Sequence, residues 1–261
     1  MIASHEPEPL QEGTLISHLI ELRTRLLRAL IAVLVLFIPC AIFDDQLFTF
    51  VATPLLEKMP RGAQMISTSL VAPFMAPLKL ALLAALFLGM PFVLYQVWAF
   101  VSPGLYRHEK RFAIPLLVSS IVLFYAGAAF AYFVVFPLMF AFLTTSAPSG
   151  VQIMTDMTNY LDFVLLLFFA FGAAFEIPVA TVLLAWTGLV RVETMVKNRG
   201  YVLLGIFVVA AFLTPPDAVS QCFMAVPMYF LYEAGIVMTR VLLKDRLAAR
   251  RAEETEEAQH D

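Results

Sequence analysis

The chain has 261 residues, of which 61% are hydrophobic and 14% are charged, and its mean hydropathy is +0.85. Soluble domains carry about 25% charged residues, and a soluble fold of this size cannot hide so much apolar surface from water. Lipid can solvate that surface instead, so the composition excludes a soluble domain and predicts an all-α integral membrane protein. The net charge of −3 is uninformative as a total, but the positions of the charges are informative.

Six apolar runs follow one another along the chain. Four of them are long enough to cross about 30 Å of hydrocarbon at about 1.5 Å per residue: 26–43, 75–101, 112–143 and 163–190. The last two, 201–214 and 218–239, are shorter and are separated by a Pro-Pro-Asp sequence. The fifth would measure roughly 21 Å as a helix, so either the bilayer thins there or the last two runs form a hairpin that does not fully cross. The prediction is therefore six transmembrane helices, the last two short.

Lysine and arginine are distributed unevenly between the two sides of this predicted bundle. The N-terminal segment up to Arg28, near the start of the first run, the connections between runs two and three and between runs four and five, and the tail together hold 14 of them. The other side holds three: Lys58 and Arg61 in the first external loop, and Lys79 near the outer end of the second run. Because cytoplasmic loops are enriched in Lys and Arg, we predict that both termini lie in the cytoplasm.

The polar parts of the chain complete the predicted domain organisation. Residues 1–13 form a disordered cytoplasmic N-terminus, 14–243 the six-helix membrane domain, and 244–261 a charged, mostly disordered cytoplasmic tail. The first external loop contains an amphipathic stretch, 47–59, that predicts an interfacial helix. Aromatic residues near the ends of the runs suggest an interfacial belt: Trp98, Tyr106, Tyr160 and Trp186.

The sequence contains no nucleotide-binding loop, hydrolase signature or metal-ligand spacing, so neither an enzyme nor a cofactor or metal site is predicted. The two cysteines, Cys40 and Cys222, lie in apolar runs, and we expect both to be small buried side chains.

Several polar residues interrupt the apolar runs. Glu176 lies in the middle of the fourth run, where an acid is costly and should face the bundle interior or a hydrated cavity; it is either functional or a purely structural carboxyl group. Pro178 predicts a bend beside it. Glu233 is nearer the cytoplasmic end of the sixth run and is either an interfacial acid or functional. Gln221 could hydrogen-bond across helices, and Asp217 is a candidate helix N-cap.

Two further acids lie in cytoplasmic segments. Glu21 is four residues before Arg25 at the start of an amphipathic helix, so the two side chains can pair on one helix face. Glu109 lies among basic and titratable neighbours. From these patterns alone, both acids would be partners in local surface ion pairs of small energetic value.

Several longer motifs together resemble the TatC family, whose members are the core receptors of the twin-arginine protein translocase. They are HLIELRTR at 18–25, PFVLYQVWAF at 91–100, YRHEKR at 106–111, FAYFVVFP at 130–137, FEIP at 175–178 and LTPPD at 213–217. The resemblance extends over about residues 14–241 and agrees with the derived topology.

The resemblance implies a protein of the cytoplasmic (inner) membrane that binds twin-arginine signal peptides. With TatB and TatA, and with self-association in the complex, it would export folded proteins using the protonmotive force and no nucleotide. The implied signal-peptide-binding residues are Glu21, Leu22, Arg23, Phe100 and Glu109.

The resemblance also implies roles for residues within the membrane. Glu176 would lie in a membrane-embedded concave face, and Thr214 and Gln221 would contact the TatA and TatB helices. Membrane lipid is the other expected partner, and nucleic acid is not.

Two alternative functions are weighed against this one. A proton-coupled secondary transporter for small solutes would explain Glu176, but it predicts paired broken helices and often an internal repeat, which the sequence does not show. An intramembrane enzyme would need a nucleophile or metal set facing a cavity, and none is visible. A single-span partner encoded beside this chain would favour the translocase.

Overall fold

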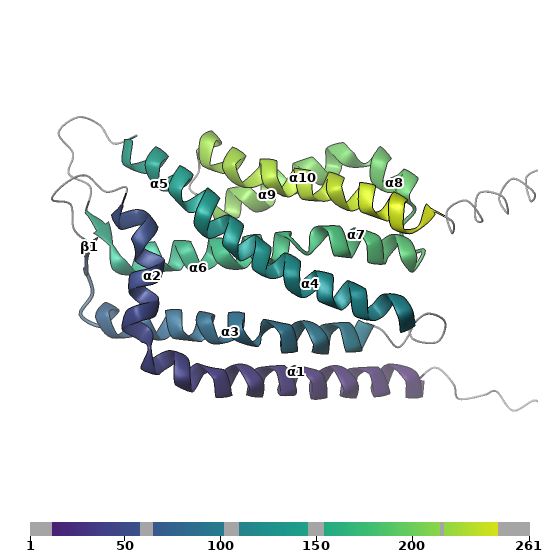
Figure 1. Ribbon diagram of the computed structural model, residues 1–261, viewed down its shortest axis with the longest axis horizontal. Helices are drawn as coiled ribbons and strands as arrows, with labels where there is room; N and C mark the ends of the chain where they lie inside the picture. The colour runs from purple at the N-terminus through teal and green to yellow at the C-terminus, as the bar shows by residue number, and fades with distance from the viewer. Residues whose placement is uncertain (1–11, 58–64, 102–109, 146–153, 215–216, 245–261) are drawn as a thin grey trace, which may run out of the picture.

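The computed structural model describes residues 12–57, 65–101, 110–145, 154–214 and 217–244. Almost all of them are helical (Figure 1). The long helices are α1 (Glu12–Ile42), α3 (Ala72–Val101), α4 (Lys110–Phe130), α6 (Met157–Ala174) and α10 (Ala218–Leu242). The shorter ones are α2 (Asp44–Leu56), α5 (Phe136–Thr145), α7 (Ile177–Trp186), α8 (Val192–Lys197) and α9 (Arg199–Leu213). A π-helical turn, η2 (Ala131–Val135), joins α4 to α5, and β1 (Met65–Ile66) pairs in parallel with β2 (Thr155–Asp156).

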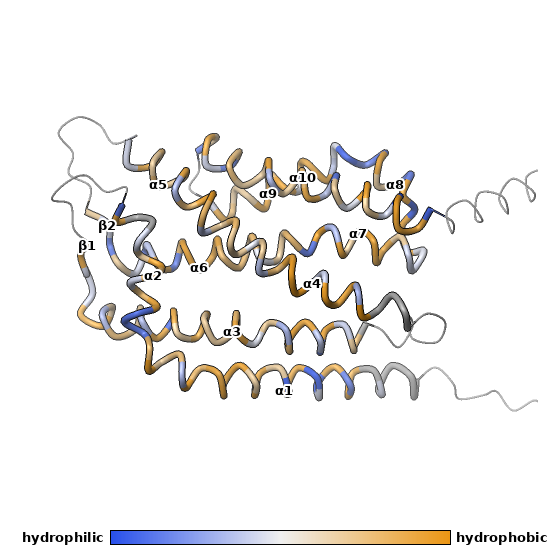
Figure 2. The backbone as a smooth tube through the Cα atoms, viewed as in Figure 1, coloured by the Kyte–Doolittle hydropathy of each residue, from blue (hydrophilic) through white to orange (hydrophobic). Residues whose placement is uncertain are grey.

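Five helical segments of the described chain are long and apolar enough to cross a membrane: Leu19–Ile42, Ala72–Phe100, Ile114–Thr145, Met157–Trp186 and Ala218–Leu242. The start of α1 and the end of α10 lie at one end of the molecule, and α2, β1 and β2 lie at the other (Figure 1). Figure 2 shows hydrophobic residues along most of the length of these helices. We call the two ends the terminal end and the α2 end.

The prediction that the last two helices are both short is wrong for one of them. Helix α9 has 15 residues, or roughly 22 Å, and is short as predicted. Helix α10 has 25 residues and is of spanning length. Its polar residues Gln221 and Glu233 lower the hydropathy of the segment without shortening the helix, and Glu233 is held by Arg199 and Tyr229.

Three local predictions are confirmed. A helix is present where the sequence predicts one at 47–59: it is α2, which spans Asp44–Leu56, and its interfacial position stays a prediction. The chain breaks between α6 and α7 at Glu176, with Pro178 in the first turn of α7, because proline lacks the N–H that would continue the hydrogen-bond ladder. Asp217 caps α10 by accepting a hydrogen bond from the Ser220 N–H at 2.7 Å.

Other expectations require correction or lie outside the described residues. Trp98, Tyr160 and Trp186 do not form an exposed interfacial belt, because all three are buried in the protein. Cys40 is buried as expected, but Cys222 is exposed on α10. Tyr106, residues 1–11 of the predicted N-terminal segment and residues 245–261 of the predicted tail lie outside the described residues. Helix α1 already begins at Glu12, two residues before the predicted start of the membrane domain.

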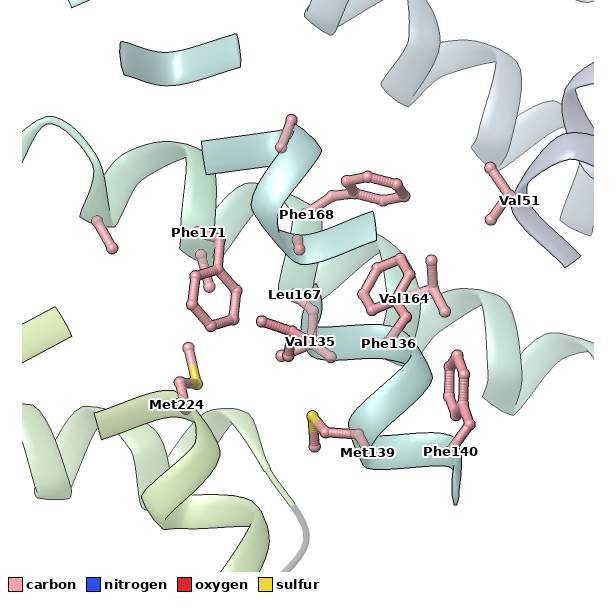
Figure 3. Close-up of a cluster of buried hydrophobic side chains, with 14 of the residues drawn as sticks. Val51, Val135, Phe136, Met139, Phe140, Val164, Leu167, Phe168, Phe171 and Met224 are labelled. Carbon is pink, nitrogen blue, oxygen red and sulfur yellow. The ribbon is translucent and has the colours of Figure 1, made fainter. Parts of the chain in front are cut away.

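The largest core cluster lies where α5 and η2 meet α6 and α10 (Figure 3). Phe136, Phe171 and Met224 are fully buried there, and the Phe136 and Phe168 rings meet edge to face with centroids 4.9 Å apart. Helices surrounded by lipid associate through such close packing, because lipid tails are as apolar as the side chains themselves. The same cluster therefore fixes the relative positions of the helices that carry the polar groups described next.

Candidate functional site

At the terminal end, the carboxylate of Glu21 is held on α1. Arg25 donates to Glu21 Oε1 from Nε at 2.8 Å and from Nη2 at 2.6 Å, which confirms the predicted pair. Arg25 Nη1 also reaches Gln96 Oε1 on α3, at 3.5 Å, and Gln96 is buried. In the described chain Glu21 Oε2 accepts no hydrogen bond, so one carboxylate oxygen remains free to receive a further donor.

The other residues implied at this site are only partly brought together. Leu22 and Arg23 are exposed on α1 beside Glu21. Phe100 is half-buried in the last turn of α3, which packs along α1 and ends at the same end of the molecule (Figure 1). Glu109 lies outside the described residues, so its approach to Glu21 stays a prediction.

At membrane depth, Glu176 faces the interior of the bundle, as predicted. Ser120 on α4, which is fully buried, donates to Glu176 Oε2 at 2.5 Å. Glu176 Oε1 is also buried and has no hydrogen-bond partner among the described residues. A buried acid with one unsatisfied oxygen is costly, so it marks a place where the fold tolerates strain or where another donor binds.

Helices α9 and α10 carry the remaining candidates. The Thr214 hydroxyl is buried and donates to the Ala210 carbonyl at 2.9 Å, so it caps α9 internally. Gln221 is half-buried in the first turn of α10. The hydrogen bond from the Ser220 backbone N–H lowers the pKa of Asp217.

Glu233 is neither an isolated interfacial acid nor free. Arg199 at the start of α9 donates to Glu233 Oε2 at 2.6 Å, and the Tyr229 hydroxyl donates to Oε1 at 2.9 Å. This three-residue network ties the short helix α9 to α10.

Sequence reasoning did not single out the partners Gln96, Ser120 and Arg199. The signal that could have found Gln96 and Ser120 is their polarity within long apolar runs, because a polar side chain in a membrane helix needs a partner inside the protein. The sequence cannot say which partner that is.

The described residues contain no group of three or more His, Cys, Asp or Glu side chains arranged to hold a metal ion. What they contain is a bundle of lipid-length helices, a held carboxylate at the terminal end and a buried acid between α4 and the α6–α7 break. The fold and these sites define a multi-pass α-helical membrane protein with paired polar side chains inside its helix bundle.

Comparison with known proteins narrows this class. The family model "Sec-independent protein translocase protein (TatC)" matches residues 17–227. TatC of Azotobacter chroococcum is 55% identical over 230 residues, which cover 88% of this chain and 90% of the relative. TatC of Escherichia coli K12 is 53% identical over 226 residues, covering 87% and 88%. A crystal structure of the twin arginine translocase receptor TatC superposes with a TM-score of 0.78 at 37% identity, covering 86% of this chain and 98% of that one. The chain belongs to the TatC family of protein translocase subunits.

Proposed function

We propose that the chain is the core receptor of a twin-arginine translocation pathway. It binds signal peptides with paired arginines at the terminal end and, with TatA and TatB, moves folded proteins across the inner membrane using the protonmotive force. Family membership supports this proposal, and so does one observation above the rest: Arg25 holds Glu21 through one oxygen, while the other oxygen accepts no hydrogen bond from the described residues. The transporter alternative loses support, because the relatives that match most of this chain are protein translocase subunits.

Orientation is part of the same proposal. Both termini lie in the cytoplasm, and α9 counts as a sixth, short span that returns the chain to the cytoplasmic side. Fourteen Lys and Arg residues belong to the segments predicted to be cytoplasmic, and three to the opposite side, which supports this orientation. The terminal end, with Glu21, then faces newly made cargo.

Recognition of arginine follows from the chemistry of the guanidinium group. Its planar fork of N–H donors matches a carboxylate, whereas the lysine ammonium is a point charge without that geometry. An incoming arginine competes with Arg25 for Glu21, and it can use the free oxygen without displacing both existing bonds. A hydrogen bond to a charged group contributes about 1.5–3 kcal/mol, which corresponds to about one to two decades of affinity.

The test is the affinity of a twin-arginine signal peptide for the reconstituted protein. Glu21→Gln keeps the shape and removes the charge, so we expect binding to weaken by about ten- to a hundredfold. Glu109→Gln should act in the same way, and the double variant should show coupling if both acids serve one site. Glu57→Gln, at the α2 end, is the matched control and should bind as wild type. Wild-type affinity in both single variants would refute carboxylate recognition.

We also propose that α9 and the start of α10 form the contact with TatA and TatB. The hydroxyl of Thr214 already donates to the Ala210 carbonyl. Of the two residues, we therefore expect Gln221 to hydrogen-bond a partner helix, through its side-chain amide. Amide groups at membrane depth hydrogen-bond across helices. Site-specific crosslinking from position 221 to the single-span subunits tests this assignment, and its absence would sink it.

A further inference from the structure

A cavity of about 320 Å³ lies at the α2 end of the molecule, between α2, α3, the η2 region and α6. Its lining is almost entirely apolar. The lining includes Leu47, Phe50, Leu83, Phe87, Phe133 and Phe168. Tyr132 also borders it, but its hydroxyl is used elsewhere, because it donates to the Phe50 carbonyl at 2.8 Å. The cavity therefore offers contacts to hydrocarbon and almost nothing to a polar ligand.

A stacked aromatic pair forms part of the rim of the cavity. The rings of Phe50 and Tyr132 are stacked, with centroids 4.6 Å apart and planes 4° apart, and this stack together with the hydrogen bond anchors α2 against η2. The π-helical turn inserts an extra residue into the helix that runs from α4 to α5, and such turns are frequent at functional sites. Phe133 in this turn remains 70% exposed, so the cavity opens sideways to the surroundings of the bundle.

Charged side chains locate the cavity along the membrane normal. Lys79 on α3 pairs with Asp162 on α6 at 2.7 Å, and both side chains are about half exposed. Leu83 and Phe87 follow Lys79 along α3 by one and two turns, or about 6 and 12 Å. The cavity thus begins just inside the charged layer, at the depth of lipid tails.

Water and protein helices are poor occupants of this space. Apolar cavities stay dry because water needs two to four polar partners. The volume is at the lower end of the range for small-ligand pockets, whereas a helix is about 10–12 Å wide and docks along several turns. An empty cavity would leave its wall atoms without dispersion partners. At this depth a bilayer supplies flexible hydrocarbon chains directly at the opening.

We propose that this pocket binds one acyl chain of a membrane phospholipid. The gain is not hydrophobic in origin, because the chain leaves one apolar medium for another; it comes from the close contacts that the carbon walls make. The bound chain fills the space between α2 and α3 and braces the stacked Phe50–Tyr132 pair.

The experiment uses the full chain in vesicles of phosphatidylethanolamine and phosphatidylglycerol. A small fraction of the phosphatidylethanolamine carries a photoactivatable diazirine within one acyl chain, and mass spectrometry locates the adducts after illumination. Phe133 at the pocket and Phe230 on α10 are the same residue type and are 70% and 68% exposed. We expect at least about threefold more adduct at Phe133 than at Phe230, which corresponds to about 0.6 kcal/mol of preference.

Two matched variants separate pocket binding from general lipid contact. Ala129 is exposed, lines the pocket and precedes Phe133 by four residues; Ala234 is exposed and follows Phe230 by four residues. Ala129→Phe fills the pocket and should reduce labelling at Phe133 to the level of Phe230. Ala234→Phe should leave the excess at Phe133 unchanged.

Equal labelling of Phe133 and Phe230 in the wild-type chain would overturn the proposal, and this comparison holds even if a variant fails to fold. Undiminished labelling of Phe133 in a folded Ala129→Phe protein would overturn it as well. A third result would also overturn the proposal: a photoreactive side chain placed at position 133 that crosslinks to another protein chain and not to lipid.

Discussion

At the scale of single residues, the polar side chains inside the bundle are held by specific partners. Ser120 holds Glu176, Gln96 supports Arg25, and Arg199 holds Glu233. Because an unpaired polar group is expensive in a low-dielectric interior, each pairing constrains where its helices can lie. Four buried side-chain polar atoms of the described chain have no hydrogen-bond partner, and among them Glu176 Oε1 is the one that belongs to a carboxyl group; the others are Thr158 Oγ1, Arg199 Nε and Ser220 Oγ. That oxygen makes Glu176 the residue whose replacement is most informative.

We hypothesise that Glu176 serves the transport step and not the initial docking of the signal peptide, because it lies at membrane depth. Glu176→Ala removes a costly group, so the protein should still insert and be at least as stable as wild type. Export of folded cargo should fall while signal-peptide affinity is retained. Ser120→Ala strands the acid and should cost about 1–3 kcal/mol in unfolding free energy. Normal export by Glu176→Ala would show that the carboxyl group is only structural.

Asp156 at the α2 end should make stability depend on pH. Its carboxylate accepts from the Thr68 hydroxyl at 2.6 Å and also from the backbone N–H groups of Thr68, Asn159 and Thr158. These bonds, the Thr68 hydroxyl first, lower the pKa of Asp156 from 3.8 to about 2. Because the folded pKa is depressed, the stabilisation is complete above about pH 4 and is lost as the pH falls through about 2.

Thermal unfolding measured between pH 7 and pH 2 checks this expectation. Asp156→Asn keeps a capping side chain without its charge, so its midpoint should lie below that of wild type at pH 7 and approach it as the pH falls towards 2. Thr68→Val removes the strongest donor and should move the loss of stability to higher pH. A gap between Asp156→Asn and wild type that stays constant from pH 7 to pH 2 would contradict the account.

At the scale of elements, glycines allow helices to approach closely. A Cβ on Gly127 would lie 2.9 Å from a ring atom of Phe175, and one on Gly172 would meet the Phe124 ring. A Cβ on Gly235 of α10 would collide with the Thr181 hydroxyl of α7 and lie 2.9 Å from the Cα of Pro178. Small residues at such crossings are the usual means by which membrane helices pack. Helices α7 and α10 therefore depend on Gly235 for their spacing.

Gly235→Ala should force α7 and α10 apart and lower the unfolding free energy by about 1–3 kcal/mol, the usual cost of overpacking. Gly205→Ala on α9 is the matched control, because nothing lies within 4 Å of the added methyl group. It should be neutral or stabilise by up to about 1 kcal/mol through helix propensity. Thr181→Ala in the Gly235→Ala background should restore part of the loss. Equal thermal shifts for the two glycine variants would argue against a tight α7–α10 crossing.

At the scale of the whole molecule, the described chain ends where it begins, with the start of α1 and the end of α10 at the same end (Figure 1). The helices leave large apolar side chains exposed along their outer faces, for example Leu26 on α1, Phe212 on α9 and Phe230 on α10. In a bilayer these faces contact lipid and need no protein partner. The remaining question at this scale is which end faces the cytoplasm.

Labelling of single cysteines from outside the cell answers that question, in a variant lacking Cys40 and Cys222. A membrane-impermeant thiol reagent should reach cysteines placed at Gly62, Ser149 and Asp217. It should miss those at Arg107, Asn198 and Arg250 until the membrane is permeabilised. The reason is the excess of basic residues at the terminal end. External labelling at Arg250 would reverse the proposed orientation.

Much of the architecture follows from the sequence, because the thickness of the hydrocarbon layer sets how many apolar residues a span needs. The presence and order of the long apolar helices, the short α9, the break beside Pro178, the Asp217 cap and the Glu21–Arg25 pair are all local features, settled by residues within a few positions of one another, although the runs did not give the exact helix bounds. The helix α2 also follows, because its sequence pattern is local.

Only the tertiary structure decided which faces of the helices turn inward and which polar groups meet. Position at the ends of the apolar runs placed Trp98 and Trp186 at an interface, although both are buried, and the run of α10 looked short although the helix has 25 residues. Ser120, which holds Glu176, lies 56 residues from it along the chain, and Gln96, which contacts Arg25 from α3, lies 71 residues from Arg25. Lipid outside and side chains inside are equally apolar, so hydropathy cannot distinguish a lipid-facing side chain from a buried one. Packing and hydrogen bonding between distant helices make that choice.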